Sequence, residues 1–134
     1  MKHFVCKKCG NLVATVNFTG KPLGCCKEEM EELTPCATSA ARGKHSPQIK
    51  VKGNKVTVSV GEEGSAHPQT VEHGIVWICL VTSGGSQRKL LAPHGPAEAH
   101  FMLTEGEEVI SAFAYCNLHG LWVTECFPNN RKHG

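Results

Sequence analysis

The distribution of cysteines limits most strongly what this chain can fold into. Eight cysteines occur in 134 residues, and four of them lie in the first 26, as Cys6 and Cys9 in "CKKC" and as Cys25 and Cys26 in "CC". The opening "MKHFVCKKCG" lacks the apolar segment of a signal peptide, so we expect a cytoplasmic protein. In a reducing compartment this number of cysteines indicates metal thiolates or free thiols rather than disulfides.

The first candidate metal site consists of these four N-terminal cysteines. Two residues separate Cys6 from Cys9, which is the usual spacing of a chelating pair, and four thiolates suit tetrahedral zinc or a single iron. Cys25 and Cys26 are unusual partners, because neighbouring side chains tend to diverge. The segment between the two pairs has room for a hairpin with its turn near residues 20–22. Scattered, unrelated cysteines are the alternative interpretation.

From residue 48 onward, short apolar runs alternate with turn signals, and no long amphipathic helix is predicted. The run 75–81, "IVWICLV", is too apolar for an edge strand and is expected in the middle of a sheet. About seven short strands in about ninety residues are typical of a small antiparallel β-sandwich of immunoglobulin type. We expect strands at 48–51, 55–61, 75–81, 88–92, 98–103, 109–115 and 121–125.

The predicted organisation is therefore a small metal-binding module at residues 1–37, a sandwich at 38–126 and a polar tail at 127–134. The acidic stretch "KEEMEELTP" ends at Pro35, and the small-residue segment "CATSAARG" after it reads as a linker. About 35 residues cannot bury a sufficient core, so the module is expected to need its metal in order to fold.

The second candidate site is dispersed along the sandwich. His45, His67 and His73 precede or end predicted strands, and Cys116 and His119 form a Cys-x-x-His pair in "YCNLHG". Imidazole and thiolate are common ligands of transition metals, and a sandwich gathers its loops at its ends. Each histidine alone is weak support for a site. The Cys-x-x-His pair is stronger, with a buried cysteine beside a surface histidine as the alternative.

Taken together, "KHxP", "AHPxxxxH", "YCNxHG" and the N-terminal "CxxC" and "CC" resemble the superoxide reductases of the desulfoferrodoxin and neelaredoxin family, including the desulforedoxin-like module of the two-iron members. The resemblance runs from about Phe4 to Glu125. It implies two mononuclear irons per chain, with zinc as an alternative in the cysteine site. It also implies one-electron reduction of superoxide to hydrogen peroxide without formation of dioxygen. The implied ligands of the catalytic iron are His45, His67, His73 and His119 in a plane and Cys116 on the axis, opposite an open sixth position.

Lys44, which precedes His45, corresponds to the family's lysine near the open position, where its charge steers superoxide and stabilises the developing product. A solvated surface lysine is the alternative from sequence alone. The family commonly has a glutamate just before this lysine, whereas this chain has Gly43. A protein carboxylate at that position is therefore not expected as the sixth ligand of oxidised iron.

The expected partners follow from the resemblance and from the charge. The family implies a rubredoxin-like electron donor, and its desulforedoxin module implies a homodimer. With 14 basic and 12 acidic residues, the chain gives no electrostatic reason to bind nucleic acid or a membrane surface. Two other functions are considered: a plain electron carrier that uses an FeCys4 site, and a zinc-ribbon interaction module.

Overall fold

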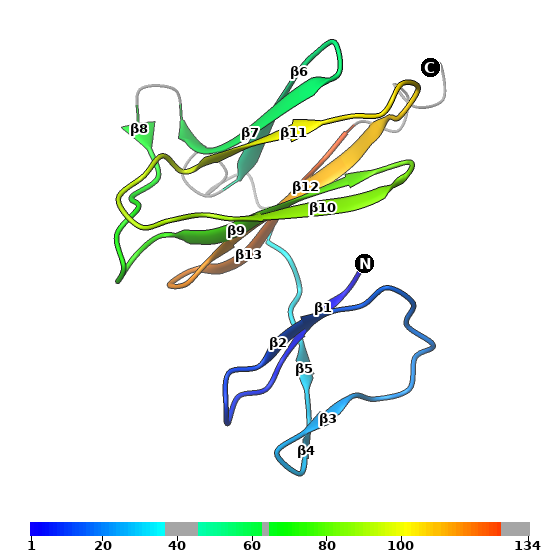
Figure 1. The fold of residues 1–134 in the computed structure, drawn as a ribbon. Helices are drawn as coiled ribbons and strands as arrows, with labels where there is room; N and C mark the ends of the chain where they lie inside the picture. Colours follow the sequence, from blue (N-terminus) through cyan, green and yellow to red (C-terminus); the bar gives the residue numbers. More distant parts are fainter. Residues whose placement is uncertain (37–45, 63–64, 127–134) are drawn as a thin grey trace. The chain divides into compact units, whose positions relative to one another are not determined.

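The computed structural model describes residues 1–36, 46–62 and 65–126, and the chain divides into two compact units, Met1–Thr34 and Pro35–Gly134 (Figure 1). The described residues form strands and turns and contain no helix, as predicted for a mostly β protein. No helix able to span a membrane occurs among them. The boundary predicted between residues 37 and 38 and the tail predicted at 127–134 lie outside the described residues.

The smaller unit consists of a three-stranded antiparallel sheet and a separate hairpin. The sheet has the order β2-β1-β5 and the hairpin pairs β3 with β4; the bounds are β1 His3–Val5, β2 Leu12–Ala14, β3 Gly24–Cys25, β4 Glu28–Glu29 and β5 Glu31–Glu32. The hairpin predicted with its turn at residues 20–22 is wrong. β2 instead pairs antiparallel with β1, the strand before it in the chain. A tight turn after Cys6 reverses the chain there, and the Gly10 N–H closes this turn by donating to the Cys6 carbonyl at 2.8 Å.

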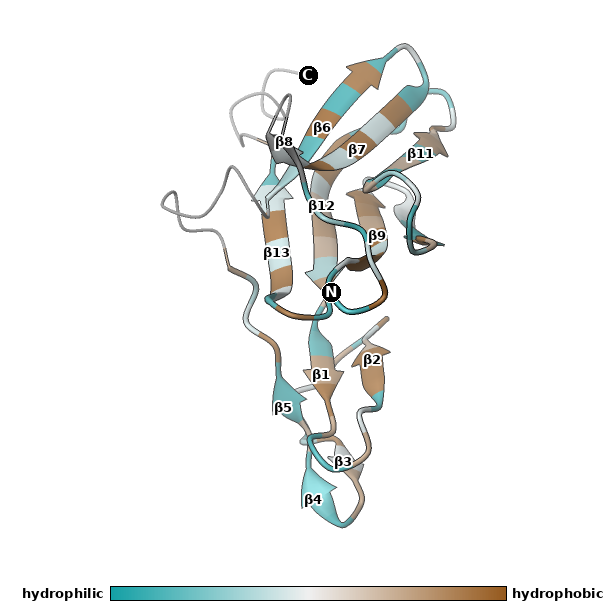
Figure 2. Cartoon of the chain, turned by 90° about the vertical axis from the view of Figure 1, so that its left-hand side faces the viewer, coloured by the Kyte–Doolittle hydropathy of each residue, from teal (hydrophilic) through white to brown (hydrophobic). Residues whose placement is uncertain are grey.

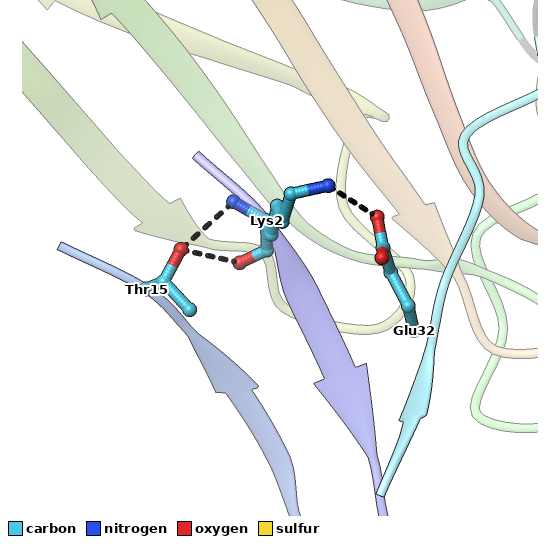
Figure 3. Close-up of polar contacts among 3 residues, drawn as sticks. All are labelled: Lys2, Thr15 and Glu32. Atoms are coloured by element: carbon cyan, nitrogen blue, oxygen red, sulfur yellow. Dashed lines mark hydrogen bonds and ion pairs between the residues drawn. The ribbon is translucent and has the colours of Figure 1, made fainter. Parts of the chain in front are cut away.

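A small apolar cluster and a network at the first residues hold this unit together. Phe4, Cys6 and Met30 are buried, and Phe18 and Leu23 pack against them. Lys2 connects three segments, as Figure 3 shows: it exchanges backbone and side-chain hydrogen bonds with Thr15, and its Nζ lies 2.9 Å from a Glu32 carboxylate oxygen. β4 and β5 are hydrophilic, as their teal colour in Figure 2 indicates, so the core of the unit is thin.

The larger unit contains two antiparallel sheets that face each other. One sheet has the order β10-β9-β12-β13, and the other has the order β11-β7-β6 with the short strand β8 paired to β7. All seven predicted strands are present. The fourth, expected at 88–92, begins earlier, because its pairing with β9 starts at Gly85, opposite Thr82. The bounds are β6 Pro47–Lys52, β7 Lys55–Glu62, β8 Ser65–Ala66, β9 Ile75–Thr82, β10 Gly85–Leu90, β11 Glu98–Met102, β12 Val109–Cys116 and β13 Gly120–Glu125.

The core of the sandwich is built from the inward-facing residues of both sheets. Alternate residues of each strand point inward, which produces the alternating brown and teal bands along β6 in Figure 2. The buried cluster spans β7, β9, β11 and β12, and Cys116 belongs to it; its largest fully buried members are Phe101, Ile75, Ile78, Leu80, Val56, Val58 and Val60. The axial ligand candidate is therefore anchored in the core of the domain.

β9 lies between β10 and β12, which confirms its predicted central place. At its first residues the pairing with β12 is irregular. Tyr115 lies opposite Trp77, whereas Cys116 lies opposite Ile75, so Val76 is left without a partner in the register. A bulge of this kind bends a strand and redirects its side chains, and bulges are common beside functional sites. This bulge lies at the end of the strand that carries Cys116.

Candidate metal centres

The four N-terminal cysteines converge, as predicted. Their sulfur atoms all lie within 4.8 Å of one another, with 3.6 Å between Cys9 and Cys25 and 3.9 Å between Cys25 and Cys26. With metal–sulfur bonds of about 2.3 Å, sulfurs at the corners of a tetrahedron lie about 3.8 Å apart. The cysteine cluster therefore has the dimensions of a tetrahedral metal site.

The β3–β4 hairpin explains how adjacent cysteines can face one site. Cys25 pairs with Glu28, so Cys26 and Lys27 are the two central residues of the turn. Both have positive φ, 53° and 63°, the combination that a type I′ turn requires. The left-handed conformation at Cys26 turns its side chain away from the alternation of a strand, and its sulfur then lies beside that of Cys25. Sequence reasoning missed this turn, because Cys-Lys is not a usual type I′ pair.

The sulfurs of this cluster do not ionise equally in the absence of a cation. The pKa of Cys6 is lowered to about 6, chiefly by hydrogen bonding from the backbone of Cys9. The pKa of Cys26 is raised to about 12 by its contacts with the sulfurs of Cys9, Cys6 and Cys25, and the pKa of Cys25 is raised by Cys6 and Cys9. Four thiolates in one cluster therefore need a positive ion to balance their charge, which fits a metal.

The second group joins two distant segments of the larger unit. His67 and His73 lie near the two ends of the loop between β8 and β9. Cys116 is the last residue of β12, and His119 lies in the turn before β13. One donor atom from each residue lies within 4.8 Å of the other three. Cys116 Sγ lies 3.6 Å from His67 Nε2 and 3.8 Å from His119 Nδ1. A single ion with bonds of 2.0 to 2.3 Å spans donors up to about 4.4 Å apart, close to this arrangement.

The hydrogen bonds of the imidazoles determine which ring nitrogens are available as donors. His67 Nδ1 lies 2.7 Å from the carbonyl oxygen of Pro68, which only accepts, so Nδ1 carries the proton and Nε2 presents its lone pair toward Cys116. Such an outer hydrogen bond is typical of histidine ligands. His73 Nε2 is buried and has no hydrogen-bond partner among the described residues. A buried imidazole nitrogen without a hydrogen-bond partner, close to three other donor atoms, fits a metal ligand.

The environment also keeps His67 in the state that a metal requires. Its pKa is lowered, first by burial and then by the nearby His73 and His119, while the Pro68 carbonyl acts in the opposite direction. The three rings pack edge to face, with centroids 4.8 Å apart for His67 and His73 and 4.9 Å for His73 and His119. Neutral imidazole is the form that coordinates metals, so the lowered pKa of His67 favours its binding to a metal near neutral pH.

The structure brings together four of the five residues that the resemblance implied for the catalytic iron. His45 and Lys44 lie outside the described residues. His94 and His100 belong to neither cluster, and His100 instead bonds Glu98 and Thr57. Cys79 is fully buried in β9 and belongs to neither cluster.

Two residues around the histidine group were missed by sequence reasoning. Asn117 makes side-chain hydrogen bonds to the backbone of the loop that carries His73, and Gln69, within that loop, makes them to the backbone of Ile75 and Ala92. The only sequence signal was their position, between His67 and His73 and between Cys116 and His119 respectively.

Comparison with known proteins gives concordant results over nearly the whole chain. The family model described as Desulfoferrodoxin matches residues 37–125. A desulfoferrodoxin homolog of Archaeoglobus fulgidus is 39% identical over 122 residues, which cover 91% of this chain and 94% of the relative. The desulfoferrodoxin of Nitratidesulfovibrio vulgaris is 38% identical with the same coverage.

Solved structures of superoxide reductases share the fold. The superoxide reductase of Treponema pallidum matches with a TM-score of 0.75 at 34% identity, covering 92% of this chain and 96% of its own. The superoxide reductase (1Fe-SOR) of Giardia intestinalis matches with a TM-score of 0.53 at 33% identity, covering 62% of this chain and 96% of its own.

The fold and the ligand groups define an all-β metalloprotein, with a four-cysteine site in a small unit and a histidine and cysteine site in a β-sandwich. Both candidate sites fit iron as the metal. With the matches above, the chain belongs to the desulfoferrodoxin family.

Proposed function

We propose that this protein is a superoxide reductase of the two-iron type, which reduces superoxide by one electron to hydrogen peroxide and forms no dioxygen. The observation that carries the proposal is the convergence of His67, His73, Cys116 and His119, within a family whose relatives include named superoxide reductases. When bound there, iron supplies the electron and a coordination position for a small anion.

The residues of the sandwich have distinct parts in this proposal. His67 and His73 bind through Nε2, because Nδ1 of His67 is engaged with Pro68 and Nε2 of His73 is the buried atom without a partner. Cys116, buried at the end of β12, supplies the thiolate, and its place in the core keeps water from the sulfur. His119 Nδ1 faces the same point. Neutral imidazoles with one thiolate leave a ferrous site with a net positive charge, which attracts an anion.

His45 and Lys44 complete the proposed site on the strength of the family resemblance. His45 would be the fourth imidazole ligand, and Lys44 would be the catalytic residue that guides superoxide and stabilises the negative charge of the product. Because Gly43 carries no carboxylate, water, hydroxide or a residue from elsewhere in the chain is proposed as the sixth ligand of the oxidised centre.

We propose iron for the cysteine site as well, in FeCys4 form, with zinc as the alternative metal. The proposed organisation is a metal-binding module at 1–37, the catalytic sandwich at 38–126 and a polar tail. The reduction of superoxide needs a redox partner, for which we propose a rubredoxin-like protein. A homodimer formed through the module and a location in the cytoplasm complete the proposal.

Metal analysis combined with absorption spectra tests this function. The purified protein is measured as isolated, after ascorbate and after a strong oxidant. Two irons per chain, with thiolate bands from both centres and a histidine-site band that ascorbate bleaches, are expected. A chain that carries zinc alone and stays colourless with oxidant after iron reconstitution would instead favour an interaction module. Iron in the cysteine site alone would favour a plain electron carrier.

A further inference from the structure

The proposed catalytic site depends on two loops that the sequence does not connect. The loop between β8 and β9 contributes His67 and His73, and the turn between β12 and β13 contributes Cys116 and His119. The donor atoms can meet at one point only if the two loops keep a fixed offset. The hydrogen bonds between the loops therefore matter for the geometry of the site.

Asn117 links the two loops through both ends of its side-chain amide. Its Oδ1 accepts a hydrogen bond from the Gly74 N–H at 3.0 Å, and its Nδ2 donates to the Val71 carbonyl at 3.0 Å. Its own backbone N–H donates to the Gly74 carbonyl at 3.1 Å. These contacts bracket His73, with partners two residues before it and one residue after it. Asn117 itself lies between Cys116 and His119 in the chain.

The opposite side of the same loop is fixed by Gln69. Its amide donates to the carbonyls of Ile75 at 2.9 Å and Ala92 at 3.2 Å and accepts from the Ile75 N–H at 2.8 Å. Gln69 thus holds the histidine loop to β9 and to the segment after β10, but it does not reach the Cys116 turn. The β9–β12 pairing sets Cys116 opposite Ile75, and beyond that pairing the side chain of Asn117 joins the two ligand loops.

The chemistry of the side chain makes asparagine specific for this place. The side-chain amide offers a donor and an acceptor on one planar group, which is what the Val71 carbonyl and the Gly74 N–H require. Aspartate would keep the bond from Gly74 but would turn a second acceptor toward the Val71 carbonyl. Asn117 is exposed, so these bonds add only modestly to folding stability and act mainly on orientation.

We propose that Asn117 is a positioning residue of the histidine and cysteine metal centre, holding the Cys116–His119 turn against the His67–His73 loop so that their donors converge. This inference rests on the proposed metal centre at these residues. Outer residues that orient ligands typically change metal affinity by about tenfold to a hundredfold when they are replaced.

Cobalt(II) binding to the full chain tests the inference without any measurement of activity. Cobalt gives thiolate bands at both sites, and the spectrum of the His73→Ala variant identifies the bands of the cysteine site alone. In Asn117→Ser, we expect the cobalt affinity of the histidine site to fall about tenfold to a hundredfold, with a shifted thiolate band. Asn117→Asp keeps the Gly74 contact but sets an acceptor against the Val71 carbonyl, so it should also weaken cobalt binding at the histidine site and shift the thiolate band. It decides the question if the serine variant fails to fold.

Gln87→Ala is the matched control, because Gln87 also donates from its side-chain amide to a backbone carbonyl, that of Met102 at 3.0 Å, and neither residue belongs to a ligand loop. It should bind cobalt as the parent does. Parental cobalt affinity and band position in both Asn117 variants, or equal losses in Asn117→Ser and Gln87→Ala, would overturn the positioning role. A parent chain that binds no cobalt at the histidine site would instead overturn the proposed function.

Discussion

Cys116 Sγ lies 3.6 Å from His67 Nε2, although the two residues are 49 positions apart in the sequence. The sulfur is in the core of the sandwich and the imidazole nitrogen is oriented by the bond from Nδ1 to the Pro68 carbonyl. Each of the two atoms is therefore positioned by an interaction of its own: burial in the core positions the sulfur, and the hydrogen bond to Pro68 orients the imidazole. From this pair the metal-binding and catalytic behaviour of the chain can be predicted.

Replacing His73 with alanine should empty the histidine site and leave the cysteine site intact. Its Nε2 is a buried ligand atom that has no hydrogen-bond partner among the described residues, so its removal takes a ligand from the metal and breaks no hydrogen bond of that atom. We expect the iron content to fall by about one atom per chain and superoxide reduction to fall at least about a hundredfold. Metal analysis and a superoxide assay measure both effects.

His100→Ala is the control, since that histidine is exposed, belongs to neither ligand group and bonds Glu98 and Thr57 through its ring. It should keep parental iron and activity. A His73→Ala protein that retains both irons would show that the histidine cluster is not the metal site.

The pKa of His67 predicts how the metal-free sandwich responds to acid. Burial lowers this pKa below its ordinary value of about 6.5, so the unfolded chain binds the proton more readily than the folded one. The stabilising contribution is present above about pH 6.5 and is lost as the pH falls below it. Urea unfolding of the metal-free protein between pH 7.5 and 5.5 measures the trend, and His67→Gln should make it shallower. An identical pH dependence in the two proteins would refute the assignment.

Gly74 is required by a close approach of the backbone. A Cβ added there would lie 2.8 Å from the Thr70 carbonyl oxygen, and the Gly74 peptide also bonds Asn117 on both sides. We expect Gly74→Ala to destabilise the sandwich by about 1 to 3 kcal/mol and to weaken metal binding at the histidine site. Denaturant unfolding and cobalt titration measure the two effects.

Gly95→Ala serves as its control, because a Cβ there meets only the Ala92 carbonyl oxygen at 3.6 Å, an ordinary contact. It should be close to neutral in both measurements. Equal behaviour of the two alanine variants would mean that the loop adjusts without disturbing the histidines.

Lys27 occupies a left-handed position in the hairpin of the cysteine site, with φ at 63°. A residue with a Cβ loses roughly 1 kcal/mol there relative to glycine. Lys27→Gly should therefore slow the loss of metal from the cysteine site to a chelator by up to about fivefold. Lys21→Gly, at an exposed lysine without positive φ, should not slow it. Faster metal loss in Lys27→Gly would contradict the proposed strain at this turn.

The sequence pattern was sufficient to predict the strands of the sandwich and the convergence of the four N-terminal cysteines. Alternation such as Val56, Val58 and Val60 reports a buried sheet face directly, and all three are buried. The predicted N-terminal hairpin was wrong, because the sequence does not reveal that the turn after Cys6 closes first and pairs β1 with β2. Pattern alone favours the Gly and Pro residues near position 21.

The details of the two sites were harder to predict from the sequence. Asn117 and Gln69 act through backbone atoms of other loops, and such contacts leave no periodic signal in the sequence. The left-handed conformation of Cys26 was likewise hidden, since type I′ turns usually carry Asn or Gly. The histidine ligands themselves could be selected only by the family resemblance, because a single histidine in a loop has no diagnostic neighbours.

The yield of hydrogen peroxide per superoxide consumed tests the central claim most directly. Ascorbate-reduced protein is mixed with superoxide, and hydrogen peroxide and dioxygen are both measured, with His73→Ala in parallel. We predict one hydrogen peroxide for each superoxide, no enzymatic dioxygen, and loss of the reaction in the variant. Half as much hydrogen peroxide with release of dioxygen, or the same rate in His73→Ala, would contradict the assignment as a superoxide reductase acting at the histidine and cysteine centre.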